Sequence, residues 1–170
     1  MMDKIVEMKP MRFAGIPVRG DYWGLPAAWQ KLIPLAHHKG LFKPGTQAMS
    51  LFMSHNQNVP MEDRLSYAAI TVGEDYQASD GLEIIDVPGG LYAVTVHLGH
   101  PDGIGDTWDQ WRTNGFSQPG YKYQEGRISF EWYQNNPQFV PEELQVALLC
   151  DPVQKINEGD MDVKNLRVCP

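Results

Sequence analysis

The sequence has little cysteine, few basic residues and no long apolar run, and each shortage excludes a class of protein. Only Cys150 and Cys169 occur in 170 residues, and neither has a closely spaced partner, which excludes a thiolate zinc cluster or a dense disulfide framework. Lys and Arg number 14 against 21 Asp and Glu, so the formal charge of -7 disfavours nucleic-acid binding and favours a cationic or neutral partner. No apolar run approaches the roughly 20 residues of a membrane-spanning helix.

Motifs for metal, cofactor or nucleophile chemistry are also missing. The five histidines show no ligand spacing with a carboxylate, and no serine lies in a Gly-x-Ser-x-Gly elbow. The glycine-rich segment 99–105 opens a predicted helix but lacks the Lys-Ser/Thr pair of a phosphate-binding loop. Charged residues occupy positions 3, 4, 7 and 9, where a signal peptide has its apolar core. We therefore expect a cytoplasmic protein without metal or cofactor.

An internal repeat organises the chain, because residues 5–69 resemble residues 84–148 at an offset of 79. The pattern Gly, Gly, Trp recurs with the same spacing, at Gly20, Gly24 and Trp29 and at Gly99, Gly103 and Trp108. A Val-Pro pair, at 59–60 and 140–141, recurs two residues out of register. We interpret this as a duplication, with coincidence as the alternative. The expected organisation is a single domain over 1–153, made of repeats at about 4–72 and 82–153, and a peripheral tail over 154–170.

Each copy predicts the same order of elements. A strand-like segment, 4–18 or 82–98, contains Pro or Pro-Gly-Gly and is expected to bend or bulge. A helix follows, with apolar residues at i, i+4 and i+7: Leu25, Trp29 and Leu32, and Ile104, Trp108 and Trp111. Two strands complete each copy, over 48–56 and 65–72 and over 127–135 and 144–153. The order predicts an α+β fold, a duplicated βαββ unit around a mainly antiparallel sheet.

A carboxylate lies in the middle of the predicted strand 127–135. Alternation places Ser129, Glu131 and Tyr133 on one face, and the offset of 79 makes Phe52 the counterpart of Glu131. The strand therefore does not require an acid at this position. Glu131 is either a solvated side chain on an exposed sheet face or the lining of a cleft, where it could hold a cation or act as an acid/base.

Aromatic residues gather near the predicted helix starts. For Trp29 and Trp108, which occupy equivalent positions, core packing is the favoured interpretation. Tyr22, Trp23 and Trp111 are better pocket candidates, because the repeat does not demand them. The candidate ligand contacts are Glu131, Tyr133, Phe52, Tyr22, Trp23, Trp111 and Trp108.

Residues 85–94, 103–108, 130–137 and 140–144 together resemble the GyrI-like small-molecule-binding domain. This family includes DNA gyrase inhibitory protein and the effector domains of AraC- and MerR-type multidrug regulators. The resemblance is strongest over 82–153 and implies two βαββ units related by pseudo-twofold symmetry, with a curved sheet and helices flanking a ligand groove. It also implies that the glutamate of the Phe-Glu-x-Tyr stretch, Glu131, lines the pocket together with Tyr133.

The resemblance implies three functions. The leading hypothesis is a stand-alone binding protein for bulky apolar or cationic aromatic molecules, with Glu131 as the counter-charge. The alternatives are a hydrolase of electrophilic toxins, in which Glu131 and Tyr133 are catalytic, and a modulator of gyrase or another protein partner such as a regulator. The sequence shows no helix-turn-helix segment, so we expect no direct binding to DNA and no direct control of transcription.

Overall fold

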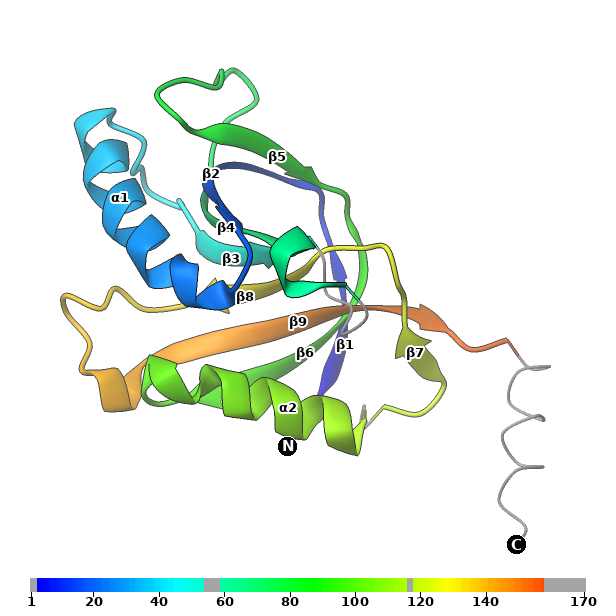
Figure 1. Ribbon diagram of the computed structural model, residues 1–170. Coiled ribbons are helices and arrows are strands. Elements are labelled where there is room, and N and C mark those ends of the chain that lie inside the picture. The colour runs from blue at the N-terminus through cyan, green and yellow to red at the C-terminus, as the bar shows by residue number, and fades with distance from the viewer. Residues whose placement is uncertain (1–2, 54–58, 116–117, 158–170) are drawn as a thin grey trace, which may run out of the picture.

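The computed structural model describes residues 3–53, 59–115 and 118–157 as an α+β fold, a curled antiparallel sheet with two helices (Figure 1). Eight strands form one hydrogen-bonded path in the order β1-β6-β9-β8-β3-β4-β2-β5. Their bounds are β1 Lys4–Met8, β2 Met11–Arg19, β3 Ala48–Phe52, β4 Leu65–Thr71, β5 Glu83–Val87, β6 Gly90–Leu98, β8 Ser129–Tyr133 and β9 Val146–Lys155. The short strand β7, Tyr121–Tyr123, pairs with β9 outside this path.

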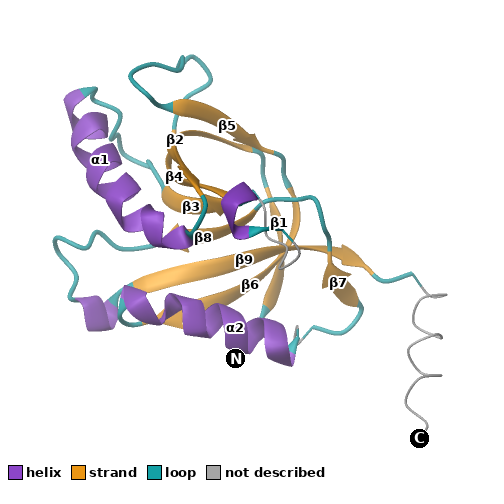
Figure 2. Ribbon diagram, viewed as in Figure 1, coloured by secondary structure: helices purple, strands orange, loops and turns teal. Residues whose placement is uncertain are grey.

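The two helices cover one face of the sheet (Figure 2). Helix α1, Leu25–His38, buries a stripe of small and aliphatic side chains against β2 and β4. Helix α2, Ile104–Asn114, buries Ile104, Trp108 and Trp111 against β6 and β9. The opposite face of the sheet closes on a core built of strand residues alone, among them Phe13 and Phe130, both fully buried.

Each predicted first strand is split in two rather than bent. The breaks fall at residues 9–10, between β1 and β2, and at residues 88–89, between β5 and β6. After each break the chain changes partner, because β1 pairs with β6 and β5 pairs with β2. The repeating unit is therefore ββαββ, and each half supplies its first strand to the sheet of the other half. Pro10 contributes to the break because proline has no N–H for a strand ladder.

Gly89 permits the close approach at the second break, since a Cβ atom built on it would lie 2.5 Å from the carbonyl oxygen of Met8. We expect Gly89→Ala to lower the free energy of unfolding by about 1–3 kcal/mol, the usual cost of overpacking. Urea denaturation measures this change in the free energy of unfolding. Gly105→Ala is the matched control, because a Cβ atom on this helical glycine meets nothing within 4 Å. Gly105→Ala should raise the free energy of unfolding by about 0.4–1 kcal/mol. Equal effects of the two variants would contradict the steric argument.

The element bounds are consistent with a duplicated unit and correct one of its equivalences. The pairs β1 and β5, β2 and β6, and α1 and α2 begin 79 residues apart, whereas β3 and β8, and β4 and β9, begin 81 apart. The two extra residues of the second copy therefore precede β8. Ser50 pairs with Ala68, and Glu131 pairs with Leu149, which is the same place in the two ladders. Thus Ser50 is the counterpart of Glu131, and the counterpart of Phe52 is Tyr133.

The far end of the chain differs from the expected tail. Strand β9 continues to Lys155, which pairs with Tyr121 of β7, so the sheet extends two residues beyond the predicted domain end. The rest of the predicted tail, from residue 158, lies outside the described residues.

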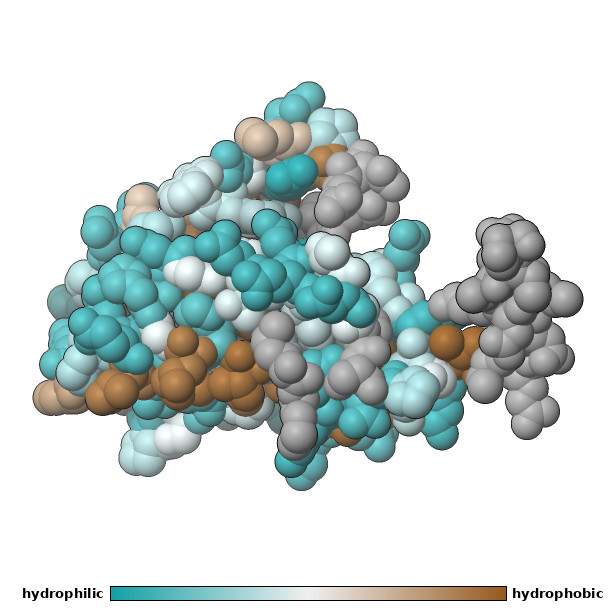
Figure 3. All heavy atoms as spheres, turned by 90° about the horizontal axis from the view of Figure 1, so that it is seen from below, coloured by the Kyte–Doolittle hydropathy of each residue, from teal (hydrophilic) through white to brown (hydrophobic). Residues whose placement is uncertain are grey.

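The surface carries some apolar side chains. Val96 and Leu98 of β6 are half or more exposed, and the face seen from below is largely hydrophilic apart from a band of hydrophobic residues along one edge (Figure 3). Within the described ranges, neither helix has the length and hydropathy needed to span a bilayer.

Candidate ligand-binding pocket

A pocket of about 660 Å³ lies between the N-terminal ends of α1 and α2. Two single-turn helices, η1 (Tyr22–Gly24) and η3 (Pro101–Gly103), lie at its sides ahead of α1 and α2. Side chains of β3, β8 and the start of β9 form its floor. The pocket therefore sits where the two halves of the sheet meet.

A hydrogen-bonded chain crosses this floor and ends on Glu131. The Trp108 indole N–H donates to Oε1 of Glu131 at 2.8 Å, and the Tyr133 hydroxyl donates to Oε2 at 2.6 Å. The Ser50 hydroxyl lies 2.7 Å from the Tyr133 oxygen and accepts from the Trp29 indole N–H at 3.2 Å. Because the single Tyr133 proton is directed at Glu131, Ser50 donates to Tyr133. Each oxygen of an ionised Glu131 carboxylate thus receives one donor.

The Glu131 side chain is buried, with 8% of the residue exposed, and burial raises its pKa. The bonds from Tyr133 and Trp108 favour the charged form and oppose that rise. Burial and the neighbouring Glu131 charge raise the pKa of Tyr133 well above its usual value. In the part of the chain that the structure describes, no Lys or Arg forms an ion pair with Glu131. Among the residues that the structure describes, the floor of the pocket therefore carries a carboxylate without an ion-pair partner.

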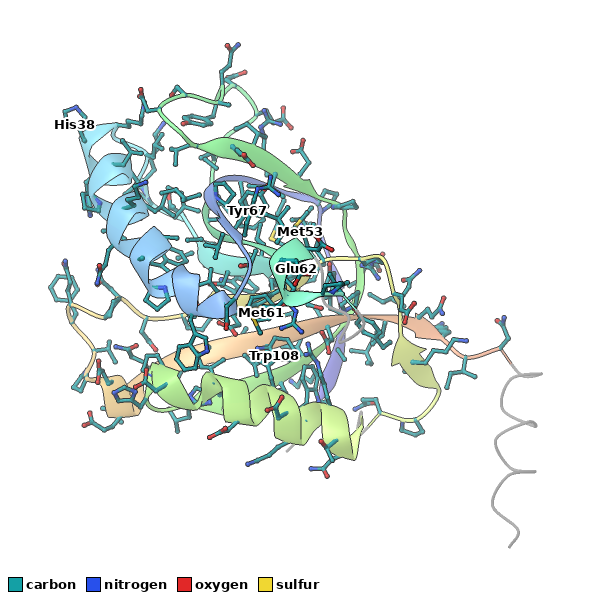
Figure 4. The ribbon with its side chains drawn as sticks, in the orientation of Figure 1. His38, Met53, Met61, Glu62, Tyr67 and Trp108 are labelled. Atoms are coloured by element: carbon teal, nitrogen blue, oxygen red, sulfur yellow. The ribbon has the colours of Figure 1, made fainter. Side chains whose placement is uncertain are left out.

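The two halves contribute matched aromatic contacts to the pocket. Trp29 packs edge-on against Tyr133 with ring centroids 5.7 Å apart, and Phe52 packs edge-on against Trp108 at 6.4 Å. These are equivalent pairs of the two copies. Trp108 projects from α2 toward the sheet (Figure 4). The centre of the site is therefore similar in both halves except for its charge, since the indole of Trp108 meets a carboxylate where that of Trp29 meets a hydroxyl.

The structure brings most of the predicted site residues to this pocket. Tyr22 is half-buried with its ring 5.1 Å from that of Phe52, and Trp23 is 86% exposed at the mouth. The prediction for Trp111 is wrong: this side chain is 2% exposed and lies in the core, with its ring 5.6 Å from that of Trp108. The prediction for Trp29 also needs correction, because its ring is half-buried and lines the pocket instead of lying within the core.

A charged pair that the sequence pattern did not indicate lies beside the pocket. The Arg112 guanidinium lies 4.3 Å from the Trp108 ring centroid and donates to both oxygens of Asp151, at 3.3 and 3.2 Å. Asp151 is 1% exposed and accepts from the Ser129 hydroxyl at 2.7 Å. Burial raises the pKa of Asp151, and Arg112 lowers it. The sequence signal that could have indicated this pair is Asp151, an acidic residue within the apolar run 146–153.

Within the described ranges, no group of three or more His, Cys, Asp or Glu side chains is placed to hold a metal ion. The histidine that lines the pocket, His97, lies 2.7 Å from the Thr107 hydroxyl and 2.9 Å from the His100 carbonyl oxygen. Both ring nitrogens therefore have partners within the protein.

Fold and pocket together define a small-molecule-binding domain. The family profile described as GyrI-like small molecule binding domain matches residues 1–153, so the chain belongs to the GyrI-like family. The resemblance noted in the sequence is confirmed, and so is the α+β fold that it implies.

Known proteins are similar to this chain in sequence or in fold. The chain is 27% identical over 141 residues to a DNA gyrase inhibitor of Yersinia enterocolitica, covering 80% of this chain and 88% of that protein. The structure of SAV2435 bound to tetraphenylphosphonium has a TM-score of 0.67 at 13% identity, over 91% of this chain and 94% of that one. The C-terminal domain of EcmrR also gives 0.67 at 13% identity, over 91% and 98% of the two chains. These structures share the fold.

Proposed function

We propose that this protein binds bulky aromatic cations in the pocket between its two halves, with Glu131 as the counter-charge. The observation that carries the proposal is the buried Glu131 carboxylate, which faces a pocket of about 660 Å³ and forms no ion pair with a Lys or Arg among the described residues. Pockets for drug-sized ligands usually measure about 300–1,000 Å³.

The energetics favour a cation over an anion or a neutral molecule. Burial of a carboxylate is unfavourable unless donors or an opposite charge stabilise it. Trp108 and Tyr133 provide the donors, and a bound cation would add the missing charge. The rings of Trp29, Tyr22 and Trp23 line the same space and present aromatic surface, which attracts cations.

Tetraphenylphosphonium and tetraphenylborate test the proposal, because the two ions have the same shape and opposite charge. In calorimetric titrations we expect the phosphonium to bind at least about tenfold more tightly than the borate, a difference of about 1.4 kcal/mol. Equal affinities, or no binding of the phosphonium, would contradict the proposal.

Acidification is expected to weaken binding of tetraphenylphosphonium. A protonated Glu131 is neutral and no longer attracts a cation, and burial raises its pKa above the ordinary 4.5, so affinity should begin to fall at a higher pH than for an exposed glutamate. Titrations between pH 4.5 and 8 measure this, with Glu131→Gln as the control, whose affinity should not change with pH. An affinity of the unmodified protein that is constant over the range would contradict it.

Hydrolysis is a second candidate, favoured by the raised pKa of Glu131 and its contact with Tyr133, which suit an acid/base in a dry site. Incubation of an electrophilic aromatic substrate with the unmodified protein and with Glu131→Gln, followed by mass spectrometry, tests it. Equal rates of product formation would exclude a catalytic role of Glu131, and binding would remain the proposed function.

A role with a protein partner is the third candidate, because a relative is named a DNA gyrase inhibitor. Addition of the protein to purified gyrase in a supercoiling assay tests it. Unchanged supercoiling would exclude this role.

A further inference from the structure

Arg112 and Asp151 form an ion pair beside the pocket, and the residues at the equivalent positions of the first half are apolar. We infer that Asp151 is a positioning residue that keeps the pocket selective for cations, because it holds the Arg112 guanidinium away from Glu131. This inference rests on the proposed function, since it concerns the charge preference of the same pocket.

Arg112 contacts the same ring as Glu131, and its charge already acts on that carboxyl, whose pKa it lowers. The guanidinium stacks on the Trp108 ring at 4.3 Å, and the N–H of that same ring donates to Glu131. Arg112 lines the pocket, and about a third of its side chain is exposed. Within the described residues Arg112 forms no ion pair with Glu131, because both oxygens of Asp151 hold its nitrogens instead.

The first half of the molecule shows that the fold does not need these charges. The counterparts of Arg112, Asp151 and Ser129 are the apolar residues Ile33, Ile70 and Ala48. Ile70 is fully buried, and Ile33 lines the pocket as Arg112 does. The same scaffold therefore accommodates an apolar set in the place of the charged network. Replacement of a buried ion pair by apolar residues of similar volume is commonly neutral or stabilising.

The balance of charges then decides which ion the pocket accepts. With Asp151 present, Arg112 and Asp151 neutralise each other and Glu131 remains available to a cation. Without Asp151, the guanidinium is free to form the bidentate contact that arginine makes with carboxylates. Four carboxylates line the pocket, those of Asp21, Asp102, Asp109 and Glu131, and only Glu131 is buried, so that it gains most from a paired charge. The buried floor of the pocket would lose the charge of Glu131 while the pocket keeps its shape.

Asp151→Asn tests this inference with tetraphenylphosphonium and tetraphenylborate. We expect the affinity for the phosphonium to fall by about tenfold or more and the preference over the borate to disappear. In the double variant Arg112→Ile/Asp151→Ile, which copies the residues of the first half, the preference should return to that of the unmodified protein. Unchanged preference in Asp151→Asn would overturn the inference, as would a double variant that loses the preference too.

Arg112→Lys distinguishes the effect of the Arg112–Asp151 contact from the effect of the net charge. It also tests the inference if Asp151→Asn does not fold. Lysine keeps the charge but lacks the planar fork that holds both oxygens of Asp151. We expect a several-fold loss of phosphonium affinity, and an unchanged affinity would overturn the inference.

A crystal structure of Asp151→Asn gives a readout that needs no ligand. The Arg112 guanidinium should lie within hydrogen-bond distance of Glu131, and a guanidinium left on its original side of Trp108 would overturn the inference. This outcome is independent of whether the unmodified protein binds tetraphenylphosphonium, which tests the proposed function.

Discussion

Glu131→Gln is expected to lower the affinity for tetraphenylphosphonium by about 10- to 150-fold. A hydrogen bond or close contact to a charged group contributes about 1.5–3 kcal/mol, which corresponds to that loss. The substitution removes the charge and keeps the size of the side chain. The scaffold tolerates a neutral residue here, since Ser50 occupies the counterpart position in β3 and accepts an indole N–H from Trp29 as Glu131 does from Trp108.

A neutral probe of similar shape, triphenylmethanol, separates charge recognition from shape. Its affinity should change little in Glu131→Gln, and a parallel loss for both probes would show that Glu131 contributes shape or stability instead. Titrations at two salt concentrations add a second check, because attraction between ions is screened by salt.

The stability of the same variant follows from the direction of the Glu131 pKa. A carboxyl group whose pKa is raised on folding favours the folded state at low pH, and this contribution is lost as the pH rises through the folded pKa. Glu131→Gln should therefore be at least as stable as the unmodified protein near neutral pH, with its relative stability lowest in acid. Urea denaturation at pH 4.5 and 7.5 measures this sign.

Trp111→Ala is expected to lower the free energy of unfolding by about 3–5 kcal/mol, the usual cost of truncating a large buried aromatic side chain. Trp111 is 2% exposed and is the largest of the fully buried side chains among the described residues. It packs with Leu149 and Val153 of β9 beneath α2, so its truncation would leave a cavity within this core.

Trp29→Ala is the control for that measurement. Its ring lines the pocket and is half-buried, so its truncation should cost less stability and should weaken binding of tetraphenylphosphonium instead. Denaturant midpoints for both variants and titrations of Trp29→Ala decide between the two roles. A larger loss of stability in Trp29→Ala than in Trp111→Ala would contradict the assignment of core and pocket.

The sequence predicted both helices, the paired strands that follow each of them and the acid that lines the pocket, because all of these depend on local patterns. Glycine, proline and apolar periodicity located the helices and most strands to within a few residues, and alternation placed Glu131 and Tyr133 on one face of β8. The apolar spacing of Leu25, Trp29 and Leu32 predicted a helix but not how far round the buried stripe extends. Trp29 lies at the edge of that stripe, and its partner across the pocket belongs to the other half of the chain.

What the sequence did not predict depends on contacts between distant segments. The exchange of β1 and β5 between the halves follows from pairing across some 80 residues, which no local pattern records. The position of the two extra residues was ambiguous until the ladders fixed it, and this ambiguity made Phe52 the expected counterpart of Glu131. Arg112 and Asp151 are 39 residues apart, and only the fold brings them together.

The strand exchange is expected to couple the folding of the two halves. Neither half completes its own sheet, because β6 borrows β1 and β2 borrows β5, so neither is expected to form a stable unit alone. Unfolding should then be a single cooperative transition, and refolding should be slow for a chain of this size, since its strand pairs close long loops.

A chain cut in the connection between β4 and β5 provides the test: the fragments should be unfolded separately and regain the near-ultraviolet circular dichroism of the intact protein when mixed. A fragment that folds alone would contradict this. The same geometry is consistent with a duplication, because two identical ββαββ chains that exchange their first strands would form a symmetric dimer, and joining them end to end would give a single chain of this topology.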